Sequence, residues 1–229
     1  MVSPQLWLLA DSRLPTGGHA HSAGLEAAAT RGLVRTPEDV AGFLAARVPT
    51  TGLLTAAASA AACALGDAAV HAPVDWGPWD AAVSARTPVA ALREVSRAQG
   101  RALLRTARAA WPSPGYDALG RRPHQALALG VVVAAAGGTP HDAAALAVHH
   151  LAGQVVSAAV RLLGMDPLAL AAVHARALAD GAATVAEAAA AGSAAAEARD
   201  PALLPAASTP LPEVLAVLHA RGDGALFAS

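Results

Sequence analysis

Histidine and cysteine are the side chains of this chain best suited to bind a transition metal, and there are nine histidines but one cysteine, Cys63. His19 and His21 flank a single residue in a polar segment, and His149 and His150 are neighbours in a helical stretch. Adjacent helical residues point about 100° apart, and neither pair has a nearby cysteine or carboxylate to complete a closed site. We expect packing or helix capping for both pairs and no resident metal, with a transient metal contact as the alternative.

The sequence has no pattern typical of a catalytic site. It lacks paired carboxylates at helical metal-site spacing, an Asp-rich magnesium motif, a recognisable Ser-His-Asp arrangement and a phosphate-binding loop. A helical protein with few aromatic residues, polar loops and one arginine face is more typical of an interaction module than of a catalyst, so we expect a protein that is not an enzyme. A helical enzyme whose site is assembled across the fold is a weaker alternative.

One predicted helix, from Thr87 to Trp111, carries five arginines on one face. They follow steps of four, four, four and three, and Glu94 is the one acidic residue among them: Arg93, Arg97, Arg101, Arg105 and Arg108. Like charges at this spacing repel one another by roughly a few tenths of a kcal/mol per pair. The face is either a docking surface for an acidic partner or a solvated outer face of a protein that uses arginine alone.

Composition indicates that helices must position all these groups. Of 229 residues, 66 are alanine, there is no lysine, isoleucine or asparagine, and only 3% are aromatic. Alanine favours helices and disfavours strands, so a β-rich fold is excluded. The 55% of hydrophobic residues and the net charge of −1 also argue against disorder and against a general nucleic-acid-binding protein.

Helix boundaries are marked by a repeated pattern, in which a side-chain oxygen precedes a proline at the first helical position. The predicted starts are Ser3-Pro4, Thr36-Pro37, Thr87-Pro88, Thr139-Pro140, Asp166-Pro167 and Thr209-Pro210. The predicted stops are Gly32, Gly66, Gly137-Gly138 and Gly164. These marks predict an all-α fold of about nine or ten helices in a single compact domain spanning residues 1–229, with no sheet.

Two further segments need interpretation. Val131 to Val133 is the best strand candidate, but it lies inside a helical window. The nearly all-alanine stretch 182–198 has few large side chains to anchor it. We expect either a helix there or a poorly ordered connection, and we allow flexibility over residues 182–208.

The chain is expected to be soluble and cytoplasmic, without a membrane span. Two charge-poor stretches, Pro49 to Gly66 and Pro123 to Pro140, are dominated by alanine rather than by leucine, isoleucine or phenylalanine. We interpret both as buried helices. Residues 1–14 show no signal peptide, and the one cysteine excludes an intramolecular disulfide.

The segment from Leu14 to Glu26 carries a more specific pattern. A Pro-x-Gly-Gly turn is followed by His-Ser-x-Gly-Leu-Glu, and the matching residues are Leu14, Pro15, Gly17, His21, Ser22, Gly24, Leu25 and Glu26. This pattern resembles the N-terminal signature of the urease accessory protein UreF family.

The resemblance continues in order along the chain. Its positions are Arg93, Glu94, Ser96 and Gly100 in one helix, Gly130 in an apolar helix, Gln154 to Arg161 in a third, and Leu226-Phe227-Ala228-Ser229 at the end. The sequence departs from the family pattern after Leu162, where Leu163-Gly164 follows, and at Ala225, where the family has arginine. These departures concern the C-terminal part of an inherited partner interface rather than the fold.

The resemblance implies an all-helical, cytoplasmic, homodimeric scaffold that is not an enzyme. Such proteins bridge UreD (also called UreH) and the GTPase UreG, gate GTP hydrolysis, and help to load nickel into the urease apoprotein. Nickel would then be cargo in transit, and no cofactor would be bound firmly. The partner-binding residues implied are Pro15, Gly17, Gly18, His21, Ser22, Glu26, Arg161, Leu226, Phe227 and Ser229. The alternative is a helical adaptor or regulator of another system that docks through the arginine-rich helix.

Overall fold

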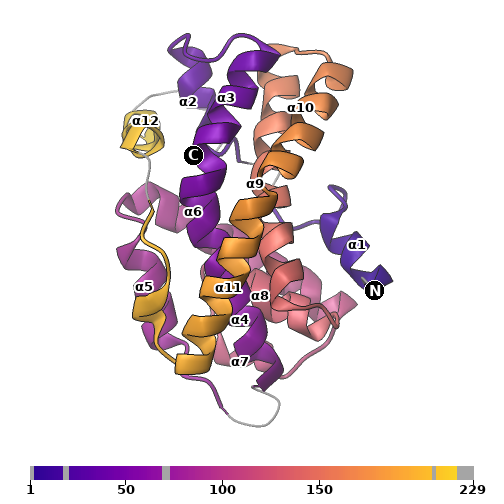
Figure 1. Cartoon of the computed structure of the whole chain (residues 1–229), viewed down its shortest axis with the longest axis vertical. Helices are drawn as coiled ribbons and strands as arrows, with labels where there is room; N and C mark the ends of the chain where they lie inside the picture. The colour runs from indigo at the N-terminus through magenta and orange to yellow at the C-terminus, as the bar shows by residue number, and fades with distance from the viewer. Residues whose placement is uncertain (1–2, 18–20, 69–72, 208–209, 221–229) are drawn as a thin grey trace.

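In the computed structural model, other helices surround one helix at the centre of the protein (Figure 1). The structure describes residues 3–17, 21–68, 73–207 and 210–220. The helical segments are α1 (Pro4–Ala10), α2 (Leu25–Thr30), α3 (Pro37–Arg47), the π-helical turn η2 (Val48–Gly52), α4 (Leu53–Ala68), α5 (Gly77–Ala85), α6 (Ala90–Ala110), α7 (Gly115–Ala118), α8 (Gln125–Ala135), α9 (Pro140–Leu163), α10 (Pro167–Asp180), α11 (Ala182–Ala198), the 3-10 turn η3 (Pro201–Leu203) and α12 (Pro210–Ala220). The described residues contain no β-sheet, which confirms the all-α prediction. The helices slightly outnumber the expected nine or ten because short segments such as the four-residue α7 are among them.

Three of the six predicted helix starts are confirmed by side-chain caps, at Thr36, Thr139 and Asp166. Helix α1 also begins at the predicted Pro4, but Ser3 makes no side-chain cap bond, and Thr209 lies outside the described residues. Thr36 and Thr139 each accept a hydrogen bond from the backbone N–H three residues later, while the Asp39 and Asp142 carboxylates accept one from the cap residue's backbone N–H. Asp166 accepts from two backbone N–H groups of α10. These reciprocal bonds satisfy donors that a helix start leaves unpaired.

Two boundary predictions are wrong, and both for tertiary reasons. Helix α6 begins at Ala90 rather than Pro88, because the Thr87 hydroxyl donates to the Val83 carbonyl and so closes α5 instead of capping α6. Gly66 does not end a helix, since α4 continues to Ala68. A Cβ atom on Gly66 would lie 3.3 Å from the Val131 Cα, so this glycine serves the close crossing of α4 and α8.

The alanines of α4 allow its neighbours to approach closely on two sides. A Cβ atom on Gly130 of α8 would lie 2.2 Å from the Ser59 carbonyl oxygen, and one on Gly192 of α11 would lie 2.4 Å from that of Ala57. Stretch 182–198 is therefore a helix in this structure, anchored by small residues rather than by large ones. Val131 to Val133 lie within α8, so the strand candidate is helical.

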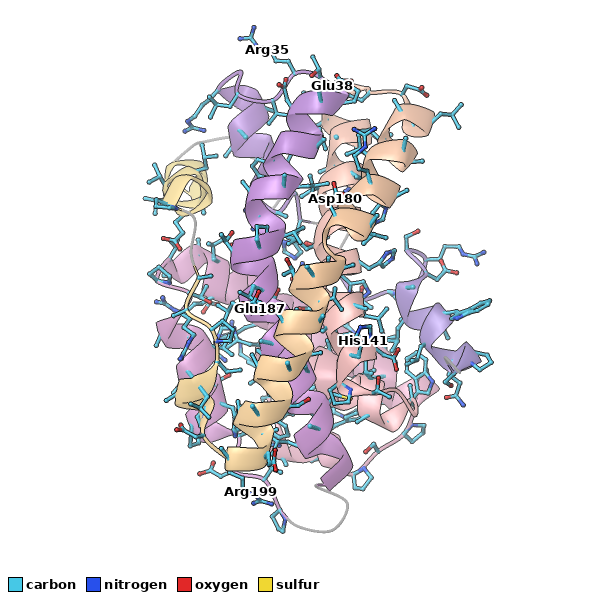
Figure 2. All side chains as sticks on the ribbon, in the orientation of Figure 1. Arg35, Glu38, His141, Asp180, Glu187 and Arg199 are labelled. Atoms are coloured by element: carbon cyan, nitrogen blue, oxygen red, sulfur yellow. The ribbon has the colours of Figure 1, made fainter. Side chains whose placement is uncertain are left out.

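The core has two parts that α9 connects. The first surrounds α4, α8 and α11 and includes Leu146 and Val148 from the first half of α9. The second lies among α2, α3, α10 and α12 and includes Val155 and Ala159 from the second half of α9. Charged side chains such as Arg35, Glu38, Asp180 and Glu187 point outward (Figure 2).

Two helical stretches among the described residues, Pro37–Gly66 and Pro140–Leu163, are long and apolar enough to cross a membrane by length and composition alone. In this fold, 72% and 50% of their most apolar windows are buried inside the protein. The bent pair α10 and α11 would count as a third span if taken as one. The apolar faces of these helices are used for packing against other helices of the chain.

Candidate functional site

The loop after α1 lies against α6. The Thr106 hydroxyl donates to the Pro15 carbonyl at 2.8 Å, and a Cβ atom on Gly17 would lie 3.3 Å from that of Ala102. Gly17 has φ of +80°, a conformation that L side chains rarely adopt. Pro15 is exposed, so this part of the loop lies at the protein surface, and α6 supports it from beneath.

The second half of the same segment turns inward. Ala23 and Gly24 both have positive φ, at 51° and 85°, and Gly24 is the N-cap of α2. His21, Ser22 and Glu26 are buried, and within the described part of the chain the Ser22 hydroxyl has no hydrogen-bond partner. These three residues therefore lie behind the surface that Pro15 presents rather than on it.

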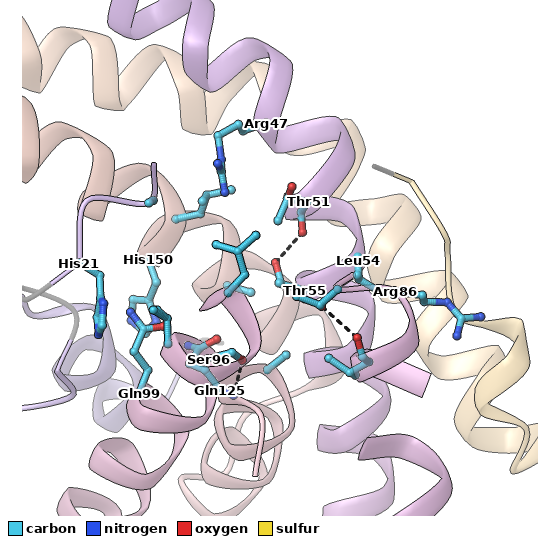
Figure 3. Close-up of a pocket in the computed structure, with 18 of the residues that line it drawn as sticks. His21, Arg47, Thr51, Leu54, Thr55, Arg86, Ser96, Gln99, Gln125 and His150 are labelled. Carbon is cyan, nitrogen blue, oxygen red and sulfur yellow. Dashed lines mark hydrogen bonds between the residues drawn. The ribbon is translucent and has the colours of Figure 1, made fainter. Parts of the chain in front are cut away.

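Residues from three distant segments meet at a cavity of about 150 Å³ (Figure 3). His21 comes from the first loop, Ser96 and Gln99 from α6, and Gln154 from α9. The Gln99 and Gln154 amides lie 3.5 Å apart. The wall also includes apolar residues from both parts of the core, so the cavity lies where the two parts meet.

The cavity wall includes a buried arginine, Arg47, and a neutral histidine, His150. Arg47 comes from the last turn of α3 and is only 6% exposed, and burial lowers its pKa from 12.5 to about 10. The His150 Nε2–H donates to the Leu9 carbonyl at 2.7 Å, and burial lowers the pKa of the ring to about 4, so His150 is neutral at pH 7. Arg47 therefore carries a positive charge in this wall at pH 7. Arg86 also lines the cavity, and its guanidinium donates to the Ala82, Ala202 and Leu204 carbonyls.

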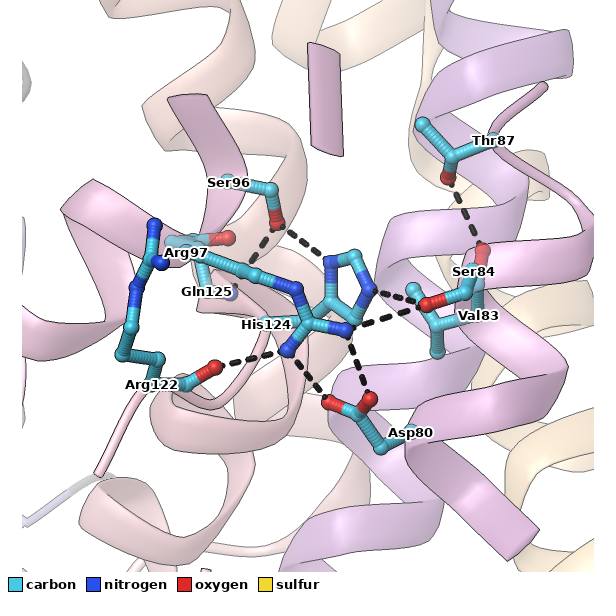
Figure 4. A network of polar contacts seen from close by, with 9 residues as sticks. All are labelled: Asp80, Val83, Ser84, Thr87, Ser96, Arg97, Arg122, His124 and Gln125. Atoms are coloured by element: carbon cyan, nitrogen blue, oxygen red, sulfur yellow. Dashed lines mark hydrogen bonds and ion pairs between the residues drawn. The ribbon is translucent and has the colours of Figure 1, made fainter. Parts of the chain in front are cut away.

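Beside the cavity, His124 is the centre of a satisfied polar network (Figure 4). Its Nδ1 lies 3.0 Å from the Ser96 hydroxyl and its Nε2 lies 2.9 Å from that of Ser84. Arg97 makes two hydrogen bonds to the Asp80 carboxylate and others to Ser84 and the Arg122 carbonyl. His124 is fully buried, and desolvation, together with the Arg97 charge, lowers its pKa to about 4.

This network explains why serine and glycine are spaced four apart in α6. Ser96 also accepts from the Gln125 backbone N–H, and a Cβ atom on Gly100 would lie 2.3 Å from the Pro123 carbonyl oxygen. Both residues thus hold α6 against the segment that starts α8. Arg93 donates to the Thr87 and Pro88 carbonyls, and Glu94 pairs with Arg122 at 2.5 Å.

The five arginines of α6 consequently do not form one docking face. Arg93 and Arg97 are used inside the chain, and Arg108 pairs with Asp117. Arg101 and Arg105 are exposed. The adaptor alternative, which relied on the whole face, keeps only these outer residues.

Comparison with known proteins shows the family of the chain. The profile of the UreF family matches residues 34–178. The urease accessory protein UreF of Mycobacterium sp. (strain JLS) is 45% identical over 224 residues, covering 98% of this chain and 97% of the relative. That of Mycobacterium marinum is 42% identical over the same length, and that of Mycobacterium tuberculosis (strain H37Ra) is 46% identical over 163 residues, covering 71% of this chain and 74% of the relative.

The chain belongs to the UreF family. The positions that carried the resemblance have structural roles in this UreF-family chain: Ser96 and Gly100 join α6 to α8, Gly130 lets α8 cross α4, and Gly24 caps α2. Leu14 and Leu25 are buried apolar residues.

The implied partner-binding residues are not brought together in one place. Pro15 is exposed on the first loop, and Arg161 is exposed in the last turn of α9, where its Nε donates to the Ser157 carbonyl at 3.2 Å. His21, Ser22 and Glu26 are buried. Gly18, Leu226, Phe227 and Ser229 lie outside the described residues.

The two histidine pairs have different outcomes. His149 and His150 both contact the end of α1, with their Nε2 atoms 3.0 Å from the Ala10 carbonyl and 2.7 Å from that of Leu9. They thus bond two of the carbonyls that α1 leaves unpaired at its C-terminus. His19 lies outside the described residues. Within the described part of the chain, no group of three or more metal-ligating side chains is placed to hold a metal ion.

Arg47 is the residue of this site that sequence reasoning missed. It follows Val40 and Leu44 at steps of four and three, and all three are buried. That spacing places the arginine on the apolar face of α3, and a charge on such a face is the signal that would have found it.

Proposed function

We propose that this chain is an accessory protein for the maturation of urease, and that it acts as a scaffold between a UreD/UreH-type protein and the GTPase UreG while nickel is inserted into the urease apoprotein. The observation that carries the proposal is identity of 45% to a urease accessory protein UreF along 98% of the chain. The role includes gating of GTP hydrolysis by UreG, with nickel as cargo in transit and no firmly bound cofactor.

The same proposal places the protein in the cytoplasm as a soluble homodimer. The first loop and the end of α9 are the contact regions that we assign to partners, because Pro15 and Arg161 are exposed there. A protein that joins partners needs exposed contact residues on rigid supports, and both positions have that support. Pro15 lies on α6 through Thr106, and Arg161 is part of a 24-residue helix.

Co-purification with UreD and UreG homologues from the same source tests the proposal. We expect both to be retained by the folded chain. A folded protein that binds neither would refute the scaffold role.

Arg161→Ala sharpens this test at one residue. Because Arg161 is exposed, we expect the melting temperature and the helical circular dichroism to stay nearly unchanged, while the complex with the GTPase weakens. Arg176→Ala, another exposed arginine on a helix, is the matched control and should leave binding intact. Loss of stability together with binding would instead indicate that Arg161 serves the fold.

A further inference from the structure

Arg47 carries a buried positive charge that the described protein groups do not neutralise. Its Nε atom is buried and has no hydrogen-bond partner among the residues that the structure describes. The ion pairs among the described residues are Arg13–Asp11, Arg97–Asp80, Arg108–Asp117 and Arg122–Glu94, so Arg47 belongs to none of them. Its pKa of about 10 still leaves the guanidinium protonated at pH 7.

The surroundings hold the guanidinium in place without supplying a counter-ion. Its Cζ lies 5.6 Å from the centre of the Phe43 ring, one turn back on the same helix. Gly24 is also close, since a Cβ atom there would lie 3.4 Å from Arg47 Nη1 and 3.9 Å from the Phe43 ring. A cation–π contact orients the charge, but burying a charge without an ionic partner remains unfavourable.

The cavity beside Arg47 has the chemistry and the size for an anion. The amides of Gln99, Gln125 and Gln154 line it and offer N–H donors that can supplement the guanidinium. The volume of about 150 Å³ greatly exceeds the roughly 10–15 Å³ that a single water requires. A guanidinium presents parallel N–H groups that match the two oxygens of a carboxylate.

We propose that this cavity is a binding site for a carboxylate, which pairs with Arg47 and accepts hydrogen bonds from the surrounding amides. The site goes beyond the scaffold role, because it depends on this chain alone and stands whether or not the accessory partners bind. The carboxylate is supplied either by a small free anion or by an acidic side chain of another protein. Both sources share the same recognition chemistry.

One acidic residue of the chain lines the same cavity. Glu213 reaches it from α12 and is half-buried. Its carboxylate competes with an incoming anion through like-charge repulsion. Glu213→Gln should therefore tighten carboxylate binding, whereas Arg47→Met should abolish it.

Acetate is the probe, with thermal unfolding of the full chain followed at constant ionic strength in acetate–chloride mixtures at pH 7. We expect the melting temperature to rise saturably with acetate, since a ligand that binds only the folded state stabilises it. In Arg47→Met the rise should disappear, and in the control Arg105→Met, which removes an exposed arginine, it should persist. Arg47→Lys keeps the positive charge but loses the parallel N–H groups of the guanidinium, so it should weaken acetate binding at least several-fold.

Without acetate, Arg47→Met should melt at a higher temperature than the original chain, because the substitution removes a buried unpaired charge and keeps an apolar side chain. A wild-type chain that shows no saturable response to acetate, or an Arg47→Met variant that responds equally, would overturn the proposal. Should Arg47→Met fold poorly, the Arg47→Lys and Glu213→Gln titrations decide, since the proposal requires their affinities to move in opposite directions.

Competition identifies the source of the carboxylate. If a partner's acidic side chain enters the cavity, acetate should weaken the partner complex of the wild-type chain, and Arg47→Met should weaken it without acetate. If a free anion is bound, the partner complex should be indifferent to both changes while the acetate-dependent stabilisation remains. In either case the acetate titration stands apart from the co-purification test, so failure of one is distinguishable from failure of the other.

Discussion

Two buried polar regions meet at Ser96 on α6, and they differ in how their charges are satisfied. Around His124, the Arg97 guanidinium pairs with Asp80 and both ring nitrogens have hydroxyl partners. Around the cavity, Arg47 is more deeply buried than Arg97 and has no counter-ion among the described residues. A satisfied network stabilises a fold, whereas an unsatisfied charge beside a cavity is a stability cost that a ligand can offset. The first region therefore has a structural role, and the second is the better candidate for binding.

The largest change in stability is expected at Gly100, where the region around His124 has no space for a larger side chain. Gly100→Ala places a Cβ atom 2.3 Å from the Pro123 carbonyl oxygen, so α6 must move away from the start of α8. We expect a loss of about 3 kcal/mol in the free energy of unfolding, measured by urea denaturation. Gly42→Ala is the matched control, because a Cβ atom there meets nothing within 4 Å and Ala favours helix over Gly. Equal effects at the two glycines would show that the close packing around Ser96 is not what stabilises this region.

Acid should destabilise the structural region strongly. The pKa of His124 falls from 6.5 to about 4 on folding, so the unfolded chain binds more protons between these values. The contribution is fully present above about pH 6.5 and is lost as the pH falls towards 4, by about 3 kcal/mol at ~1.4 kcal/mol per pKa unit. Urea denaturation of wild type and His124→Gln at pH 7.5 and 4.5 measures it. The variant should lose less stability on acidification, and an identical loss would contradict the assignment.

His150 is the corresponding titratable group in the cavity. Its pKa is also lowered to about 4 by burial, so the sign of its pH dependence is the same as for His124. Wild type will therefore carry both contributions, and His150→Gln run beside His124→Gln separates them. If only His150→Gln removes the loss of stability on acidification, the pH dependence comes from the cavity and not from the network around His124.

The two arginines give the most direct contrast, although each effect is smaller. Arg97→Met leaves Asp80 without its partner, and we expect a loss of about 2 kcal/mol because the pair is only partly exposed. Arg47→Met should instead gain about 1 kcal/mol in the absence of a carboxylate. Chemical denaturation at pH 7 measures both. Two losses of similar size would mean that the described residues do satisfy Arg47.

Sequence alone predicts the parts of the fold that local chemistry decides. The capping residues Thr36, Thr139 and Asp166 act within four residues of their own position, so their helices could be located without tertiary information. The helix boundaries predicted at Gly66 and Thr87 were wrong because both residues have tertiary roles. Gly66 allows close contact with Val131, and the Thr87 hydroxyl bonds to the end of α5.

The same distinction applies to the candidate site. The first-loop pattern could be recognised, but the burial of His21 and its meeting with Gln154 depend on how α6 and α9 pack. Arg47 belongs to no motif and is informative only through its position on a buried face. The glycine of the apolar helix, Gly130, was visible as part of a pattern, whereas its purpose required the position of α4.

The small residues along α4 also have a consequence for how stability depends on temperature. Each buried alanine of α4 buries a single methyl group and loses no rotamer entropy. The helices are therefore held by close van der Waals contact rather than by burial of large apolar side chains. Exposure of apolar area is what makes the heat capacity rise on unfolding. We therefore expect a heat capacity change per residue below the usual ~12–15 cal/mol/K, and a stability curve that is broader than that of a leucine-rich bundle of equal length.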